Sequence, residues 1–174
     1  MNPHDLVLTP TGLRFGGRRF PCTIGRGGIT SHKREGDGAT PTGRHRIVGM
    51  LYRPDRMARP ASWAAPIGPP DLWSDDPDDG AYNLMVRAPY PASHEKLRRG
   101  DPLYDLVLLT DWNWPYPVSG RGSAIFIHQW RRPGYPTEGC IALRRDHLRW
   151  IAAHITPGTL LVVKPRNQSA SRMV

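Results

Sequence analysis

The chain of 174 residues has only two cysteines, Cys22 and Cys140. They allow one disulfide at most, so the disulfide-rich class of small secreted domains is excluded. The seven histidines lack the paired spacing of metal ligands, and no zinc-finger pattern is present. We therefore expect no metal site. We interpret Cys22, which lies in an apolar run, as a buried small hydrophobic residue.

Long apolar runs are also absent. Crossing a bilayer takes about 20 consecutive apolar residues, whereas only 39% of this chain is apolar and its mean hydropathy is −0.51. The first eight residues have the pattern of a strand and not of a signal peptide. We expect no transmembrane segment, and the lack of a visible signal peptide favours the cytoplasm as one alternative for the location.

Lysine is scarce, because arginine supplies most of the 24 basic residues. The net charge is +9, and residues 121–174 carry nine basic side chains against two acidic ones. Such a surface attracts polyanions, such as nucleic acids, anionic membranes or acidic wall polymers; the alternative is a solvated basic face. Because no helix-turn-helix pattern and no RNP-like aromatic segment are present, we expect no nucleic-acid partner.

Proline and glycine, by contrast, are abundant. The chain has 19 prolines and 18 glycines, where average usage would give about 9 and 12. This composition favours short strands joined by many loops, and the length corresponds to a single domain, 1–174. We predict a mainly β fold with one clear helix over 146–154, whose apolar face carries Leu148, Ile151 and Ile155.

Apolar, β-prone runs predict the positions of the strands. They are 6–8 and 13–15, which form a hairpin, and then 19–24, 42–51, 82–86, 103–112, 124–130 and 157–163. Residues 93–99 are predicted to form one or two helical turns, and the glycine-rich stretch 25–43 a structural loop.

The stretch 53–79 is rich in proline and aspartate and is longer than a usual connection. Its rigid prolines stand next to Trp63 and Trp73. We interpret it as an ordered flap that covers a cleft and excludes water from it; the alternative is a disordered loop.

One histidine and one cysteine, His128 and Cys140, stand twelve residues apart. A short strand carries His128, a turn-rich loop follows, and Cys140 comes directly after Gly139. This order would bring the two side chains together. A thiol is a weak nucleophile until a base favours its thiolate, and histidine suits that role because its ordinary pKa is near neutral. The alternative is that both residues only pack in the core, where cysteine is common.

This segment resembles the signature of the YkuD-type L,D-transpeptidases, a histidine on a strand, a loop, then Ser/Thr-His-Gly-Cys and an apolar residue. His128 matches the first histidine, Thr137 the hydroxyl residue, Gly139 the glycine and Cys140 the nucleophile. Other stretches that resemble the family are 35–43, 122–128 and 157–163. The resemblance implies the family's β-sandwich fold, with Cys140, His128 and Gly139 as catalytic residues.

The chain departs from the family pattern at three positions. Glu138 stands where the family usually has a second histidine, Ala142 where many members have an arginine, and Gln129 where a small residue often follows the first histidine. These changes indicate a divergent branch. Because a carboxylate beside a thiol disfavours the thiolate, we expect Glu138 to point elsewhere or to bind a group of the loop.

By this resemblance, the chain is expected to be a peptidoglycan L,D-transpeptidase. The Cys140 thiolate would attack a stem-peptide carbonyl between an L-centre and a D-residue, while His128 moves the proton. The amides of Gly139 and Cys140 would hold the oxyanion. An amine of a second stem would resolve the thioester, giving 3-3 links by family default or 1-3 links. By the same resemblance, no metal or organic cofactor is expected. Carbapenem-type inhibitors are expected partners, and the cell envelope is the expected location.

Arg131 and Arg132 are expected to bind substrate carboxylates, because arginine forms bidentate pairs with them. The alternative is plain surface charge on the loop. Further residues expected to line the cleft are Trp73, Asp76, Tyr82 and Asn83.

Two other functions remain open. One is a cytoplasmic L,D-carboxypeptidase, in which water takes the place of the acceptor amine. The other is a non-enzymatic basic module that binds the cell wall or nucleic acid. The missing signal peptide favours the first of these, and only the positive charge favours the second.

Overall fold

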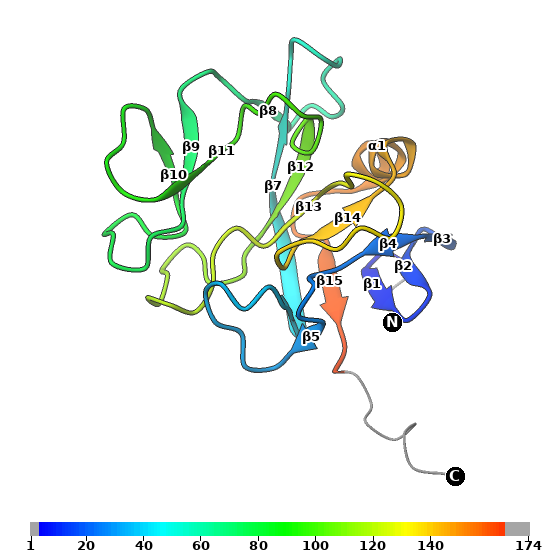
Figure 1. Cartoon of the computed structure of the whole chain (residues 1–174). Helices are drawn as coiled ribbons and strands as arrows, with labels where there is room; N and C mark the ends of the chain where they lie inside the picture. The colour runs from blue at the N-terminus through cyan, green and yellow to red at the C-terminus, as the bar shows by residue number, and fades with distance from the viewer. Residues whose placement is uncertain (1–3, 166–174) are drawn as a thin grey trace.

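The computed structural model describes residues 4–165 (Figure 1). In this part of the chain the expected fold class, mainly β with one helix, is confirmed. The elements are β1 (Leu6–Thr9), β2 (Gly12–Phe15), β3 (Arg18–Phe20), β4 (Cys22–Thr23), β5 (Ile29–Thr30), β6 (Thr40–Pro41), β7 (Gly43–Tyr52), β8 (Ala65–Pro66), β9 (Asp71–Ser74), β10 (Met85–Arg87), β11 (His94–Lys96), β12 (Leu106–Thr110), β13 (Phe126–Gln129), β14 (Ile141–Leu143), α1 (Arg145–His154) and β15 (Leu160–Val163).

The long strand β7 connects the two halves of the main sheet. The hydrogen-bonded order is β3-β2-β1-β15-β7-β12-β13-β14-β4. Residues 43–46 of β7 pair with β15, and residues 47–52 pair with β12. The two outermost strands, β3 and β4, are separated in the chain only by Pro21. The ends of the sheet therefore lie close together, and the sheet curls around its core.

The core lies inside this curl. Fully buried side chains from separate strands and from the helix meet there, among them Leu6, Ile47, Leu108, Ile127 and Ile151. The predicted apolar face of α1 is confirmed, because Leu148 and Ile151 are buried and Ile155 is buried just beyond its end. Strand β12 is almost continuously apolar because it lies in the sheet interior, between β7 and β13.

A second, three-stranded sheet has the order β10-β9-β11 and stands on the far side of β7 from α1 in Figure 1. Its presence corrects two predictions. Residues 93–99 are not helical, since β11 pairs with β9. Tyr82 and Asn83 lie in a turn before β10, with Asn83 at φ 57°. Pairing with β9 decides both outcomes, and this pairing is not visible in the local sequence.

Pro21 divides the strand predicted over 19–24 into β3 and β4, because proline has no N–H for the ladder. Cys22 begins β4 and is half-buried against the core. The stretch 53–79 packs on the main sheet through β8, which pairs with β7, and through Ala64 and Ile67, which are buried. Within residues 4–165, no helix is long and apolar enough to span a membrane.

Candidate functional site

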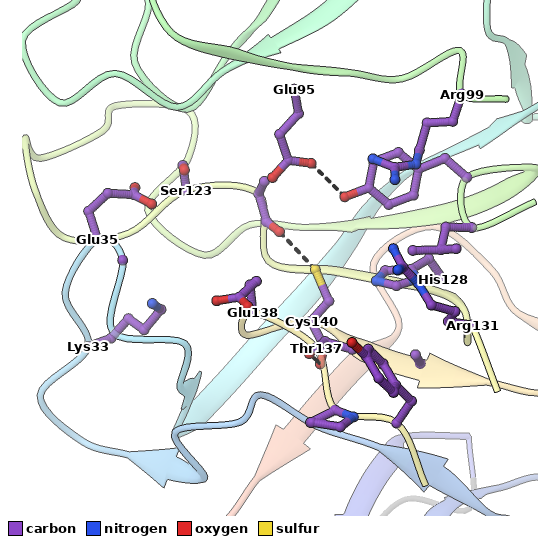
Figure 2. A pocket seen from close by; sticks show the side chains of 17 residues that line it. Lys33, Glu35, Glu95, Arg99, Ser123, His128, Arg131, Thr137, Glu138 and Cys140 are labelled. Carbon is purple, nitrogen blue, oxygen red and sulfur yellow. Dashed lines mark hydrogen bonds between the residues drawn. The ribbon is translucent and has the colours of Figure 1, made fainter. Parts of the chain in front are cut away.

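A cavity of about 340 Å³ brings His128 and Cys140 together (Figure 2). Strand β13 supplies the histidine, and the turn that leads into β14 supplies the cysteine. These strands are parallel neighbours, with His128 opposite Ala142. The cavity is lined by Lys33, Glu35, Gly36, Glu95, Arg99, Leu103, Tyr104, Ser123, Ala124, His128, Arg131, Tyr135, Pro136, Thr137, Glu138, Cys140 and Ala142.

A turn fixed by Thr137 presents Cys140. The Thr137 hydroxyl donates to the Cys140 carbonyl at 2.6 Å and accepts the Gly139 N–H at 3.2 Å. The backbone of Thr137 is itself held by the chain at 24–26: its N–H donates to the Ile24 carbonyl, and its carbonyl accepts the Arg26 N–H. The hydroxyl residue of the motif therefore shapes the turn that presents Cys140.

The glycine-rich stretch 25–43 supports this turn from behind. The Thr40 hydroxyl donates to the Gly139 carbonyl at 2.8 Å and accepts the Gly25 N–H at 3.0 Å. Gly139 has φ +141°, and a Cβ there would meet the Ala39 carbonyl oxygen at 2.9 Å. Gly25 lies equally close, because its Cβ would stand 2.9 Å from the Gly139 Cα. The expected structural role of the stretch is confirmed, and its Lys33, Glu35 and Gly36 also line the cavity.

Two backbone groups hold the Cys140 sulfur. The thiol donates to the Ala124 carbonyl at 3.1 Å, and the Phe126 N–H donates to the sulfur at 3.4 Å. Ala124 adopts a positive φ of 51° and donates its N–H to the Asn83 side-chain oxygen. Asn83, which is 2% exposed, also accepts the indole N–H of Trp73. A buried polar network thus fixes the carbonyl that accepts the hydrogen bond of the thiol.

His128 presents a free ring nitrogen to the cavity. Its Nδ1 lies 2.7 Å from the Gln129 carbonyl oxygen. Because a carbonyl only accepts, Nδ1 must carry the proton, and the neutral ring keeps Nε2 as an acceptor. Tyr104 packs edge-on against the ring, with centroids 5.2 Å apart. In Figure 2 the His128 ring lies beside Cys140, with a ring nitrogen on the side of the sulfur.

Burial keeps both residues neutral at rest. Burial lowers the pKa of His128 to about 4, and the Gln129 carbonyl opposes that shift. Burial raises the pKa of Cys140 to about 12, and the nearby Glu95 carboxylate adds to the rise. A preformed thiolate–imidazolium pair is disfavoured by both shifts. The arrangement therefore suits general-base transfer of the thiol proton during attack on a carbonyl.

One of the two expected oxyanion donors is already occupied. The Gly139 N–H donates to the Thr137 hydroxyl, so it is directed into the turn. The Cys140 amide stays a prediction for this role. Gly139 instead serves by its conformation, since a side chain there would collide with the Ala39 carbonyl.

The residues expected to bind substrate divide into two groups. Arg131 lines the cavity, while Arg132 lies over the Tyr135 ring at 4.7 Å and does not line it. The four residues expected in the cleft, Trp73, Asp76, Tyr82 and Asn83, do not line it either.

These four side chains form supports behind the site or lie away from it. Trp73 and Asn83 fix Ala124, as described above. The Tyr82 hydroxyl donates to Glu35 and accepts the Gly122 N–H. Asp76 caps a turn by accepting the Asp78 N–H. The expectation that they line the cleft is wrong, because their polar groups are used to order the loops around it.

The expected flap over the cleft is also wrong, because no residue of 53–79 lines the cavity. Trp63 packs against the main core, and Trp73 packs edge-on against Phe126, with centroids 5.0 Å apart. Large apolar rings gain more from burial than from covering a polar cavity. The cavity is bordered instead by the loop 131–138 and by residues 95–104.

Several ionisable lining residues had no signal in the sequence motif: Lys33, Glu35, Glu95, Arg99 and Tyr104. Lys33 is buried and pairs with Asp37, while Arg99 pairs with Asp101. Glu138 behaves as expected, because the Nε of Arg26 contacts its two oxygens at 2.9 and 2.8 Å. Within residues 4–165, no group of three or more histidine, cysteine or acidic side chains could hold a metal ion.

The chain is similar to a known protein family and to a solved structure. A model of the family described as YkuD, L,D-transpeptidase catalytic domain, matches residues 12–163, which is most of the chain. No curated protein matches the chain. Among solved structures, the chain is similar to an L,D-transpeptidase from Mycobacterium smegmatis, with 15% identity and a TM-score of 0.41. The similarity covers 88% of this chain and 52% of that protein, so the chain spans about half its length.

Proposed function

The chain belongs to the YkuD family of L,D-transpeptidase catalytic domains, and from that membership we propose that it cross-links peptidoglycan stem peptides through a thioester on Cys140. The observation that carries the proposal is the single cavity shared by the Cys140 thiol and the unprotonated Nε2 of His128. A nucleophile, a base and a residue that orients the base are the parts that covalent acyl transfer requires. Here a backbone carbonyl, that of Gln129, orients the base.

In the first half of the reaction, the donor stem acylates the enzyme. The Cys140 sulfur attacks the carbonyl that joins an L-centre to the terminal D-residue, and His128 takes the thiol proton at Nε2. The lowered pKa of His128 makes the imidazolium a strong acid. It therefore gives the proton readily to the departing amine, and a thioester remains.

In the second half, an amine from another stem attacks the thioester and restores the thiol. The link formed is 3-3 by the family's default, and 1-3 is the second possibility. No cofactor takes part in these steps. Arg131 lines the cavity and is proposed to bind a carboxylate of the substrate.

The same site is proposed to react with carbapenem-type inhibitors, which acylate an activated cysteine. The envelope is the proposed location. It is supported by the positive charge of the sequence at 121–174, nine basic side chains against two acidic ones, which suits an anionic wall. Fractionation of cells that carry a tagged copy tests this. A protein found only in the cytoplasm would contradict it.

The direct test is product analysis by mass spectrometry after incubation with disaccharide tetrapeptides. We expect cross-linked dimers from the wild type and from Cys22→Ala, and none from Cys140→Ala. Cys22 is the matched control, since it is the second thiol of the chain and its pKa is raised by burial to about 11. Tripeptide monomers with free D-amino acid as the sole products would replace the proposal with a carboxypeptidase. No reaction at all would favour a binding module.

A further inference from the structure

Two carboxylates of the cavity, those of Glu95 and Glu35, form no ion pair with any residue in 4–165. Glu138 is paired with Arg26. Glu95 and Glu35 each have only a tyrosine hydroxyl: Tyr104 donates to Glu95 at 2.6 Å, and Tyr82 donates to Glu35. Burying a carboxylate that has no ion-pair partner is costly, and at Glu95 the charge of Arg99 offsets that cost only in part, since burial still raises the Glu95 pKa. Such a carboxylate is therefore able to form an ion pair with a cationic group of the substrate.

Of the two, Glu95 is the one close to the reacting atoms. It stands on β11, where the alternation that buries Leu97 completely also turns Glu95 inward. Its charge contributes to the raised pKa of Cys140. In Figure 2, Glu95 and His128 lie on different sides of the Cys140 sulfur. One oxygen of Glu95 accepts the Tyr104 hydroxyl, and in the described part of the chain the other has no hydrogen-bond partner.

The second half of the proposed reaction needs a group of this kind. An acceptor amine is an ammonium ion at neutral pH, and an ammonium ion has no lone pair for attack. It must lose a proton before the carbon–nitrogen bond forms. His128 is a weak base for this purpose, because burial lowers its pKa to about 4. Burial raises the pKa of Glu95, which makes Glu95 a better proton acceptor than an exposed carboxylate.

We propose that Glu95 binds the ammonium group of the acceptor stem and takes one of its protons, so that a neutral amine attacks the Cys140 thioester. This inference rests on the proposed function and assigns the acceptor side of the same site. The Tyr104 hydroxyl holds one oxygen of the carboxylate and leaves the other to face the amine.

The step balances as follows. The ammonium gives one proton to Glu95, and the amine nitrogen then forms a bond to the thioester carbon. His128 Nε2 takes the second proton from nitrogen, and the carbon–sulfur bond breaks with its electron pair on sulfur. The Cys140 thiolate takes that proton from His128. The products are an amide with one N–H, the free thiol, and a proton that Glu95 returns to solvent.

Hydroxylamine separates this role from a structural one, because it is uncharged at neutral pH and needs no deprotonation before attack. The donor is a disaccharide tetrapeptide, and the acceptor is either a second stem peptide or hydroxylamine. For Glu95→Gln we expect the rate of cross-linking to fall by at least about tenfold, as for loss of a hydrogen bond to a charged group. Hydroxamate formation should stay within about threefold of the wild type. Glu138→Gln is the matched control and should change neither rate beyond tenfold, since Arg26 already neutralises that carboxylate.

Glu95→Asp keeps the charge and serves as the second variant if Glu95→Gln does not fold. It should retain more cross-linking, relative to hydroxamate, than any neutral replacement. The inference would be overturned if the ratio of cross-link to hydroxamate were the same in the wild type and in Glu95→Gln, whether both products keep their rates or both fall by the same factor. If the wild type cross-links while the product ratio of Glu95→Gln is unchanged, only the role of Glu95 is removed and the proposed function stays intact. A wild type that forms neither product removes both.

Discussion

Burial sets the protonation states of the two residues that we propose react. The Cys140 thiol donates to the Ala124 carbonyl, and His128 Nδ1 donates to the Gln129 carbonyl, so each is neutral and fixed in direction. The motif was sufficient to predict this pair from sequence. It could not reveal Glu95, whose place in the cavity depends on the pairing of β11 with β9, or Tyr104, which lies in the turn before β12.

His128→Ala should lower turnover by about 10²–10⁴, the usual range for general acid–base assistance. The reason is that His128 offers an unprotonated Nε2 in the same cavity as the thiol. Steady-state rates over a range of pH measure the effect. His147→Ala is the control, because His147 contacts Phe20 on the helix side of the molecule and does not line the cavity. Equal losses in the two variants would remove the assignment.

Alkylation of Cys140 should show no thiolate plateau near neutral pH. Because burial raises the pKa of Cys140 to about 12, the thiolate fraction should grow about tenfold for each unit between pH 7 and pH 9. Iodoacetamide labelling of the Cys22→Ala variant, followed by mass spectrometry, measures the rate. A rate that is already constant above pH 7 would instead indicate a stable thiolate–imidazolium pair.

At the scale of elements, the central feature is the turn 137–139 and its support by the stretch 25–43. The apolar strands and α1 could be predicted, because their patterns follow burial. The support of the turn could not, since it depends on contacts between Thr40, Gly25 and Gly139, which are far apart in the chain. The wrong assignments, the flap over 53–79 and the helical turns over 93–99, share this cause: pairing and packing across the fold decided them.

Thr40→Val should destabilise the fold by about 1–3 kcal/mol, the range for leaving buried polar groups unpaired. Thr40 is 1% exposed, and its hydroxyl serves both the Gly139 carbonyl and the Gly25 N–H. Denaturant unfolding measures the loss, and turnover should fall with it because the turn carries Cys140. The control is Thr11→Val, an exposed position where the hydroxyl has a bond of 3.4 Å. Equal stability of the two variants would contradict this role.

At the scale of the whole molecule, the curled sheet buries the site's histidine, and this has a cost in acid. His128 has a pKa of about 4 in the folded protein, against an ordinary value of 6.5. Between these values the unfolded chain binds the additional proton. The contribution of the neutral His128 ring to the free energy of unfolding is therefore complete above pH 6.5. It is lost as the pH falls towards 4, by about 3 kcal/mol in all.

His128→Gln should remove this part of the pH dependence. Free energies of unfolding at pH 7 and pH 4 give the comparison, and the wild type should lose about 3 kcal/mol more than the variant over this interval. Parallel losses in the two proteins would show that the buried ring is not the cause.

The central claim is that Cys140 carries the acyl group of the donor stem. Intact-protein mass spectrometry tests it most directly, after a brief incubation with disaccharide tetrapeptide and an acid quench that preserves thioesters. We expect the wild type and Cys22→Ala to gain the mass of the donor less its terminal D-residue, and Cys140→Ala to gain nothing. An adduct that persists in Cys140→Ala, or cross-linked products formed by that variant, would contradict the account.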